Sequence, residues 1–231
     1  MNLQDLLKNN SASFHPVVPF NATAQKLLMI DFTENNKELA PDILNDLESF
    51  ISYINNKLIQ ANASYGIGGY DEYRGVYSAS KVFDATHGAE PRRLHLGIDI
   101  WAPGGTPVYA PLPAIVHSFS FNDAFGDYGA TLILQHQLED AMLYTLYGHL
   151  SLASIVDKQE GQVIQAGDWI AAFGAPHENG NWPPHLHFQI IRDLGGMKGD
   201  YPGVCALSER KKYLANCPDP DLILQMIKFA N

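Results

Sequence analysis

Two short apolar segments each carry a pair of side chains that can bind a metal ion. In the first, Leu94–Ile100, apolar and polar residues alternate, as expected of a strand whose side chains point to opposite faces in turn. Leucine and isoleucine then form one face, while His95 and Asp99 share the other. Gly97 lies between these two and adds no side chain, so the imidazole and the carboxylate can lean toward one point.

The second segment, Pro184–Ile190, repeats this alternation and places His185 and His187 on one face. A single histidine on a half-buried strand is more often a hydrogen-bonded structural residue than a ligand. Four metal-competent groups on polar faces beside apolar ones favour a metal site instead.

A catalytic zinc site takes three protein ligands and leaves a fourth position for water. Two histidines and one aspartate satisfy this requirement, and one imidazole is then left over. Together with His149, in the segment Tyr147–Leu150, the spare imidazole is available for proton transfer.

At these residues the sequence resembles the lysostaphin/LytM-type zinc endopeptidases. That family is identified by His-x-x-x-Asp, a later histidine in a Gly-His-Leu context, and His-x-His. The same order is found here, with matching surroundings, over residues 90–191. The matching segments are His95–Ala110, Leu146–Ser151, Gly161–Ile170 and Pro184–Phe188.

The resemblance implies one zinc ion per chain and a role for each of five residues. By position, His95, Asp99 and His187 correspond to the zinc ligands. His149 and His185 correspond to the two histidines that assist the attack of water on a peptide carbonyl. Elementary chemistry agrees, because zinc lowers the pKa of bound water to about 7 and imidazoles titrate in the same range.

Two features depart from the family pattern. The segment Gly174–Pro184 is bulkier than the short turn that usually precedes His-x-His, and it carries Trp182. We therefore expect the groove that selects the substrate to differ. Gln189 replaces the glutamate that commonly follows His-x-His-Phe, a change that leaves the ligands intact.

A second resemblance covers nearly the whole chain beyond residue 13. It is to a peptidase-like module of some large bacterial proteins, where the module lies between a kinase-like domain and a pyridoxal-phosphate aminotransferase domain. This association favours an intracellular substrate that is a short peptide or a small molecule. The segments that carry it are Ile67–Tyr77, Trp182–Ile191, Gly199–Val204 and Cys217–Leu224.

The expected fold is mainly β, with an antiparallel β core of the lysostaphin-type duplicated hybrid motif. Short alternating segments, punctuated by glycine and proline, run through this region without a helical period. We place the metallopeptidase-like β domain at residues 70–195. The clearest predicted strands are Thr106–Ala110, Ala114–Phe119, Thr131–Gln135, Leu143–Tyr147 and Trp169–Phe173.

The flanking regions are predicted to differ from the core. Residues 1–69 form an N-terminal α/β extension with a strand at Gln25–Thr33, an amphipathic helix at residues 41–62 and a glycine-rich loop at Tyr65–Tyr70. Residues 196–231 form a tail of short helices. The remaining histidines include His117 and His136 in apolar runs, which we interpret as structural, and His87, to which no role is given.

Composition limits the partners. Fifteen Lys and Arg against twenty-five Asp and Glu give a net charge of −10, which disfavours nucleic acid and anionic membrane surfaces. The start of the chain lacks the pattern of a secretory signal, so the expected location is the cytoplasm. Cys205 and Cys217 are then expected to be free thiols.

Together these features predict a zinc-dependent endopeptidase or amide hydrolase that acts on a peptide or a peptidoglycan fragment. Two alternatives stay open, a metal-dependent enzyme for a small non-peptide substrate and a non-catalytic zinc-binding module. The sequence indicates no oligomeric state.

Overall fold

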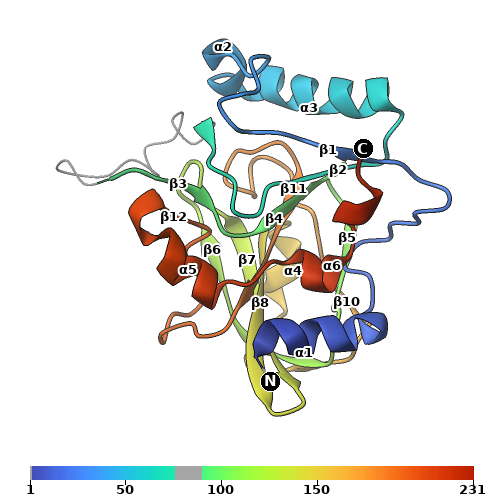
Figure 1. Cartoon of the computed structure of the whole chain (residues 1–231), viewed down its shortest axis with the longest axis vertical. Helices are drawn as coiled ribbons and strands as arrows, with labels where there is room; N and C mark the ends of the chain where they lie inside the picture. Colours follow the sequence, from blue (N-terminus) through green and yellow to red (C-terminus); the bar gives the residue numbers. More distant parts are fainter. Residues whose placement is uncertain (1, 76–89) are drawn as a thin grey trace.

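The protein is built around one large sheet (Figure 1). Its structure, a computed structural model, describes residues 2–75 and 90–231, so His87 and the end of the segment Ile67–Tyr77 lie outside the described residues. In spatial order the strands are β1 (Leu27–Met29), β2 (Tyr65–Gly68), β4 (Ile98–Trp101), β11 (His185–Ile191), β8 (Ala141–Leu150), β7 (Gly129–Leu138), β6 (Ala114–Asn122) and β9 (Val163–Ile164).

Neighbouring strands of this sheet are antiparallel, except for the parallel pair β1 and β2. The predicted mainly β fold with an antiparallel core is confirmed. All seven residues of β11 are buried. Its polar face is therefore covered by other parts of the chain, which is where a site for small molecules can form.

Two further sheets have two strands each. One pairs β5 (Pro107–Tyr109) with β10 (Trp169–Ala172), and the other pairs β3 (Arg92–His95) with β12 (Val204–Ala206). The five strands that we regarded as clearest are all present.

The single strand predicted at Leu94–Ile100 is wrong, because the segment is divided between β3 and β4 in different sheets. The chain leaves β3 at Leu96, whose N–H donates to the Gly203 carbonyl at 2.8 Å. Leu94 and Leu96 consequently pack in a different apolar cluster from Ile98 and Ile100.

The predicted helix at residues 41–62 is two helices, α2 (Pro41–Leu44) and α3 (Leu47–Ala61). Asp46 adopts an extended conformation between them, and its carboxylate accepts a hydrogen bond from the Ser49 N–H at 2.8 Å. An aspartate in this position starts a new helix. The apolar period continues across the break, which is why the sequence pattern does not reveal it.

The loop predicted at Tyr65–Tyr70 is also wrong in its first half, which forms β2. Gly66 and Gly68 are needed for close approach and not for a turn. A Cβ atom on Gly66 would lie 2.4 Å from Ile30 Cδ1, and one on Gly68 would lie 2.5 Å from the Ile30 carbonyl oxygen.

The two ends of the described chain pack on the same sheet. The N-terminal helix α1 (Leu3–Asn10), followed by a 3-10 turn at Ser11–Ser13, lies beside α6 (Asp221–Leu224) (Figure 1). The tail predicted at residues 196–231 is helical only from Leu207 onward, since β12 forms a strand before it. Its other elements are two 3-10 helices (Leu207–Glu209 and Ile227–Phe229) and α5 (Arg210–Asn216); α4 (Ala153–Val156) lies earlier in the chain.

The last residues of the chain extend the sheet at its β1 edge. Ala230 forms a parallel bridge with Leu27, and Asn231 exchanges backbone hydrogen bonds with Leu27 and Met29. The strand of the extension and the C-terminal residues thus belong to one hydrogen-bonded array. The proposed division at residues 69/70 and 195/196 stays a prediction.

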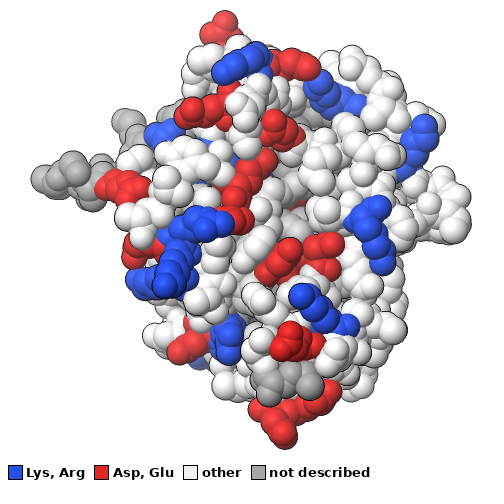
Figure 2. All heavy atoms as spheres, viewed as in Figure 1, with Lys and Arg blue, Asp and Glu red and all other residues white. Residues whose placement is uncertain are grey.

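The helices, the surface charge and the cysteines can be compared with what the composition predicts. In the described part of the chain, no helix combines the length and apolar character that a bilayer crossing requires. On the face drawn in Figure 2, basic side chains lie among acidic ones.

Cys205 and Cys217 are buried and free, as expected, and burial raises their pKa values to about 11 and about 12.

His136 provides a stability prediction. It is buried on β7, where Nδ1–H donates to the Pro113 carbonyl at 3.0 Å and Nε2 lies 2.7 Å from the Thr145 hydroxyl oxygen. Burial lowers its pKa from 6.5 to about 4. The unfolded chain therefore takes up the proton first, and stability is lost as the pH falls from 6.5 toward 4.

We expect this histidine to account for about 3 kcal/mol of that loss. Urea unfolding of wild type and His136→Gln over this pH range measures it. The variant should be less stable at pH 7 and should show a shallower decline toward pH 4. Parallel curves for the two proteins would contradict the assignment.

Candidate active site

Three of the predicted residues meet in one buried cluster. His187 on β11 lies directly opposite Asp99 on β4 in the antiparallel pairing, and His95 comes from the end of β3. His187 Nδ1 is 2.9 Å from His95 Nε2 and 3.1 Å from Asp99 Oδ1. His95 Nε2 is 3.4 Å from the same carboxylate oxygen. Gly97 makes this approach possible, since a Cβ atom there would lie 2.5 Å from the His187 ring.

Hydrogen bonds on the far side of each ring fix which nitrogen faces the cluster. His95 Nδ1–H donates to the Gly69 carbonyl at 2.9 Å, which leaves Nε2 as an acceptor. His187 Nε2–H donates to Gln189 Oε1 at 2.9 Å, which leaves Nδ1 as an acceptor. With the Asp99 oxygen, three lone-pair donors point at one another, an arrangement that calls for a cation between them.

The spacing fits zinc. Ligands at 2.0–2.1 Å from a tetrahedral zinc ion are about 3.3 Å apart. The three separations in the cluster, 2.9, 3.1 and 3.4 Å, bracket this value. Within residues 2–75 and 90–231 these three residues form the one group of histidine, cysteine and acidic side chains close enough to hold a metal.

The charge states also suit a cation. Burial lowers the pKa of His95 to about 3, and the Arg74 charge acts in the same direction. Burial alone would raise the pKa of the Asp99 carboxyl, but His95 and Arg74 hold it well below its usual range. A neutral imidazole and an ionised carboxylate are the forms that bind a metal.

Arg74 holds the second oxygen of Asp99. Its guanidinium donates to Asp99 Oδ2 at 2.5 Å and, through Nε, to Glu72 Oε2 at 2.7 Å, and the side chain is only 2% exposed. Asp99 is thereby left with one oxygen for the cluster. Outer hydrogen bonds of this kind orient metal ligands.

We expect Arg74→Met to lower zinc affinity by about 10–100-fold, because Asp99 loses its fixed orientation. Zinc titration against a competing chelator measures this. Arg74→Lys should give an intermediate affinity, since one ammonium group cannot span both carboxylates.

A matched control is Lys198→Met. Lys198 forms an ion pair with Glu160 on the surface, where both side chains are more than half exposed, and its loss should leave zinc affinity unchanged. Equal zinc affinity of Arg74→Met and wild type would show that Asp99 does not depend on this contact.

His149 is directed toward the cluster by an irregularity in the sheet. Between the pairs Ala130–Leu150 and Leu132–Tyr147, β8 has two residues where β7 has one, which is a β-bulge. His149 occupies the bulge with φ of 60°, a left-handed conformation that is rare outside glycine. Such strained positions occur most often at functional sites.

His185 lies next to His149, with ring centroids 4.1 Å apart. Each ring donates its Nδ1–H to a carbonyl at 2.7 Å, that of Pro183 for His185 and that of Asn179 for His149. Nε2 is therefore the unprotonated nitrogen of both. Burial lowers both pKa values, that of His149 strongly, so the two rings are neutral at pH 7.

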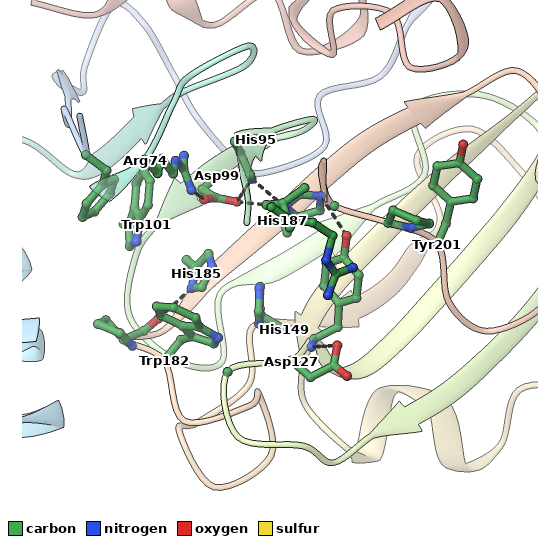
Figure 3. A pocket seen from close by; sticks show the side chains of 18 of the residues that line it. Arg74, His95, Asp99, Trp101, Asp127, His149, Trp182, His185, His187 and Tyr201 are labelled. Carbon is green, nitrogen blue, oxygen red and sulfur yellow. Dashed lines mark hydrogen bonds and ion pairs between the residues drawn. The ribbon is translucent and has the colours of Figure 1, made fainter. Parts of the chain in front are cut away.

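The cavity beside these residues has a volume of about 180 Å³. The side chains that line it differ between its two ends. In Figure 3, Trp101 and Trp182 lie on one side of the histidines, and Asp127 and Tyr201 lie on the other.

A family model for peptidase family M23 matches residues 93–199. This region of the chain is similar to peptidase family M23. The match contains the cluster of His95, Asp99 and His187 as well as His149 and His185, which is the constellation that the sequence pattern singles out.

Two curated relatives are each similar to a part of the chain. The DD-carboxypeptidase/endopeptidase Mpg of Neisseria meningitidis is 36% identical over 97 residues, which are 42% of this chain and 20% of that protein. The L-Ala–D-Glu endopeptidase of Bacillus subtilis is 27% identical over 124 residues, 52% of this chain and 36% of that protein. The chain thus spans about a fifth to a third of the length of these relatives.

Among solved structures, the catalytic domain of lysostaphin from Staphylococcus simulans is 21% identical, with a TM-score of 0.41. The similarity covers 70% of this chain and 97% of that domain.

The M23 region and its surroundings also contain residues that sequence reasoning missed. Tyr128 places its hydroxyl 3.3 Å from His187 Nε2, in space that Gly148 and Gly203 leave open. Asn179 is fully buried and holds the loop before β11 by hydrogen bonds to the backbone of Gly174 and Trp182. For Tyr128 and Asn179 no spacing in the sequence pointed to a role.

The structure brings all five predicted site residues together, while their roles as ligands and catalytic groups stay predictions. Trp182 borders the cavity, and the expected difference of the groove from the family pattern stays a prediction. His177 is exposed and lies outside the cavity lining.

Proposed function

We propose that the chain is a zinc-dependent peptidase that hydrolyses an amide bond. The observation that carries the proposal is the convergence of three acceptor atoms at zinc-ligand spacing, with two neutral imidazoles beside them. The similarity of the matched region to a peptidase family supports it.

His95 Nε2, Asp99 Oδ1 and His187 Nδ1 would hold the ion. A zinc ion supplies Lewis-acid chemistry, which polarises a carbonyl oxygen and activates water for attack on the amide carbon. The protein supplies the proton transfers. His149 and His185 each present an unprotonated Nε2. One of these nitrogens can accept the proton of the attacking water and then donate that proton to the leaving amine.

We further propose that the substrate is a peptide or small amide, including a short peptidoglycan fragment. The names of the two curated relatives refer to peptide bonds of D-amino acids, which supports this class. That the substrate is met in the cytoplasm is part of the proposal, and fractionation of cells that produce the protein would check it.

The test combines metal analysis with turnover. Wild type should bind one zinc ion per chain, and His187→Ala should lose it. His149→Ala should keep zinc and lose about 10²–10⁴-fold in turnover, because a positioned proton carrier contributes this much. His177→Ala, an exposed histidine outside the cavity, is the matched control and should retain both properties.

Two results would count against the proposal in different ways. If purified wild-type protein holds no zinc and the ligand variants behave like wild type, no metal site exists. If the protein is loaded with zinc but hydrolyses neither peptides nor small amides, it is a non-catalytic zinc-binding module.

A further inference from the structure

We infer that the N-terminal extension builds an apolar subsite beside the metal cluster, and that the substrate presents a large apolar side chain next to the scissile amide. The inference rests on the proposed peptidase function. It goes beyond the matched family region, because two of the residues that form the subsite, Phe32 and Phe50, lie outside residues 93–199.

The apolar subsite is one wall of the cavity, which we call the apolar wall. It consists of four aromatic side chains: Phe32, Phe50, Trp101 and Trp182. The Phe32 ring centroid lies 5.0 Å from that of Trp101 and 5.9 Å from that of Phe50. Phe50 continues the wall to Trp182, at 6.4 Å. The wall is thus one connected group of rings and not a set of separate apolar residues.

The extension contributes two of the four rings, from two separate segments. Phe50 lies on the buried face of α3 together with Ile54 and Leu58, and Phe32 follows β1. Both pack in one apolar cluster with Trp101 of β4. In Figure 1, α3 lies beyond the β1–β2 end of the sheet, and its Phe50 lines the cavity from outside the matched region.

The apolar wall reaches the reacting groups. Trp101 is stacked on His185, with ring centroids 5.7 Å apart and planes at 17°. The Trp182 ring meets the His149 ring edge to face at 6.4 Å. A substrate group that contacts the wall therefore lies within one residue of an amide bond at the histidines.

The opposite end of the cavity is polar and would orient the substrate. In Figure 3 Asp127 lies across the histidines from Trp101 and Trp182, and the charges of Asp200 and Arg92, which also line the cavity, act on Asp127. The charged side chain that does border the wall, Arg74, lies over the Phe32 ring and pairs with Asp99 and Glu72. An apolar substrate side chain is therefore expected to bind at the end of the cavity that the aromatic rings form.

Aromatic walls favour bulky apolar groups, since each buried carbon adds to binding and a glycine would leave the rings without contact. Discrimination of about tenfold or more per added methylene is typical of such pockets. We therefore expect a clear preference for phenylalanine or leucine over glycine at one position that flanks the scissile bond.

The experiment uses pairs of peptides that differ only in glycine, leucine or phenylalanine at that position. Wild type should hydrolyse the phenylalanine or leucine peptide at least about tenfold better, in kcat/KM, than the glycine peptide. Phe50→Ala should reduce this ratio at least about fivefold. Ile59→Ala, on the exposed face of the same helix with its side chain 74% exposed, should keep the wild-type ratio.

A binding measurement makes the test independent of turnover. N-acetylphenylalaninamide should bind wild type at least about tenfold more tightly than N-acetylglycinamide, as followed by calorimetry or tryptophan fluorescence. If Phe50→Ala fails to fold by circular dichroism, Trp182→Ala in the loop before β11 is compared in its place.

Equal binding of the two amides by wild type would overturn the apolar subsite, as would an unchanged ratio in both Phe50→Ala and Trp182→Ala. Absence of hydrolysis with a retained preference in binding would instead refute the peptidase function and leave the subsite standing.

Discussion

The site depends on an electrostatic constraint: three acceptor atoms are held close together in a buried cluster, and none of them carries a proton. The nitrogens of His95 and His187 and the oxygen of Asp99 repel one another unless a proton or a cation joins them. Each is prevented from turning away by a contact on its far side. The strands β3, β4 and β11 supply one group each, so the constraint links two sheets whose strands do not pair with each other.

The outer contacts set the character of the site. Gly69 accepts from His95, Gln189 accepts from His187, and Arg74 occupies the second oxygen of Asp99. Gln189 is a neutral amide where a carboxylate is common in the family, and its Nε2 also donates to the Pro202 carbonyl and to the thiol of Cys217. A carboxylate could make neither of these donations, which explains why glutamine suits this position.

Much of the core and the five site residues could be predicted from the sequence, because alternation, turn residues and ligand spacing are local signals. The features that could not be predicted depend on contacts between residues that lie far apart in the sequence. The glycines of β2 suggest a loop until Ile30 is seen to press against them. The bulge at His149 depends on the pairing of β7 with β8. Arg74 lies 25 residues before its partner Asp99, with no pattern to connect them.

The bridge between Ala230 and Leu27 has a practical consequence for handling the protein. β1 is an edge strand, and unpaired edge strands invite pairing with another molecule. The C-terminal residues cover part of this edge by backbone hydrogen bonds with Leu27 and Met29. Trimming residues from this end would uncover the edge and favour aggregation, even though no side chain of the catalytic cluster would be touched.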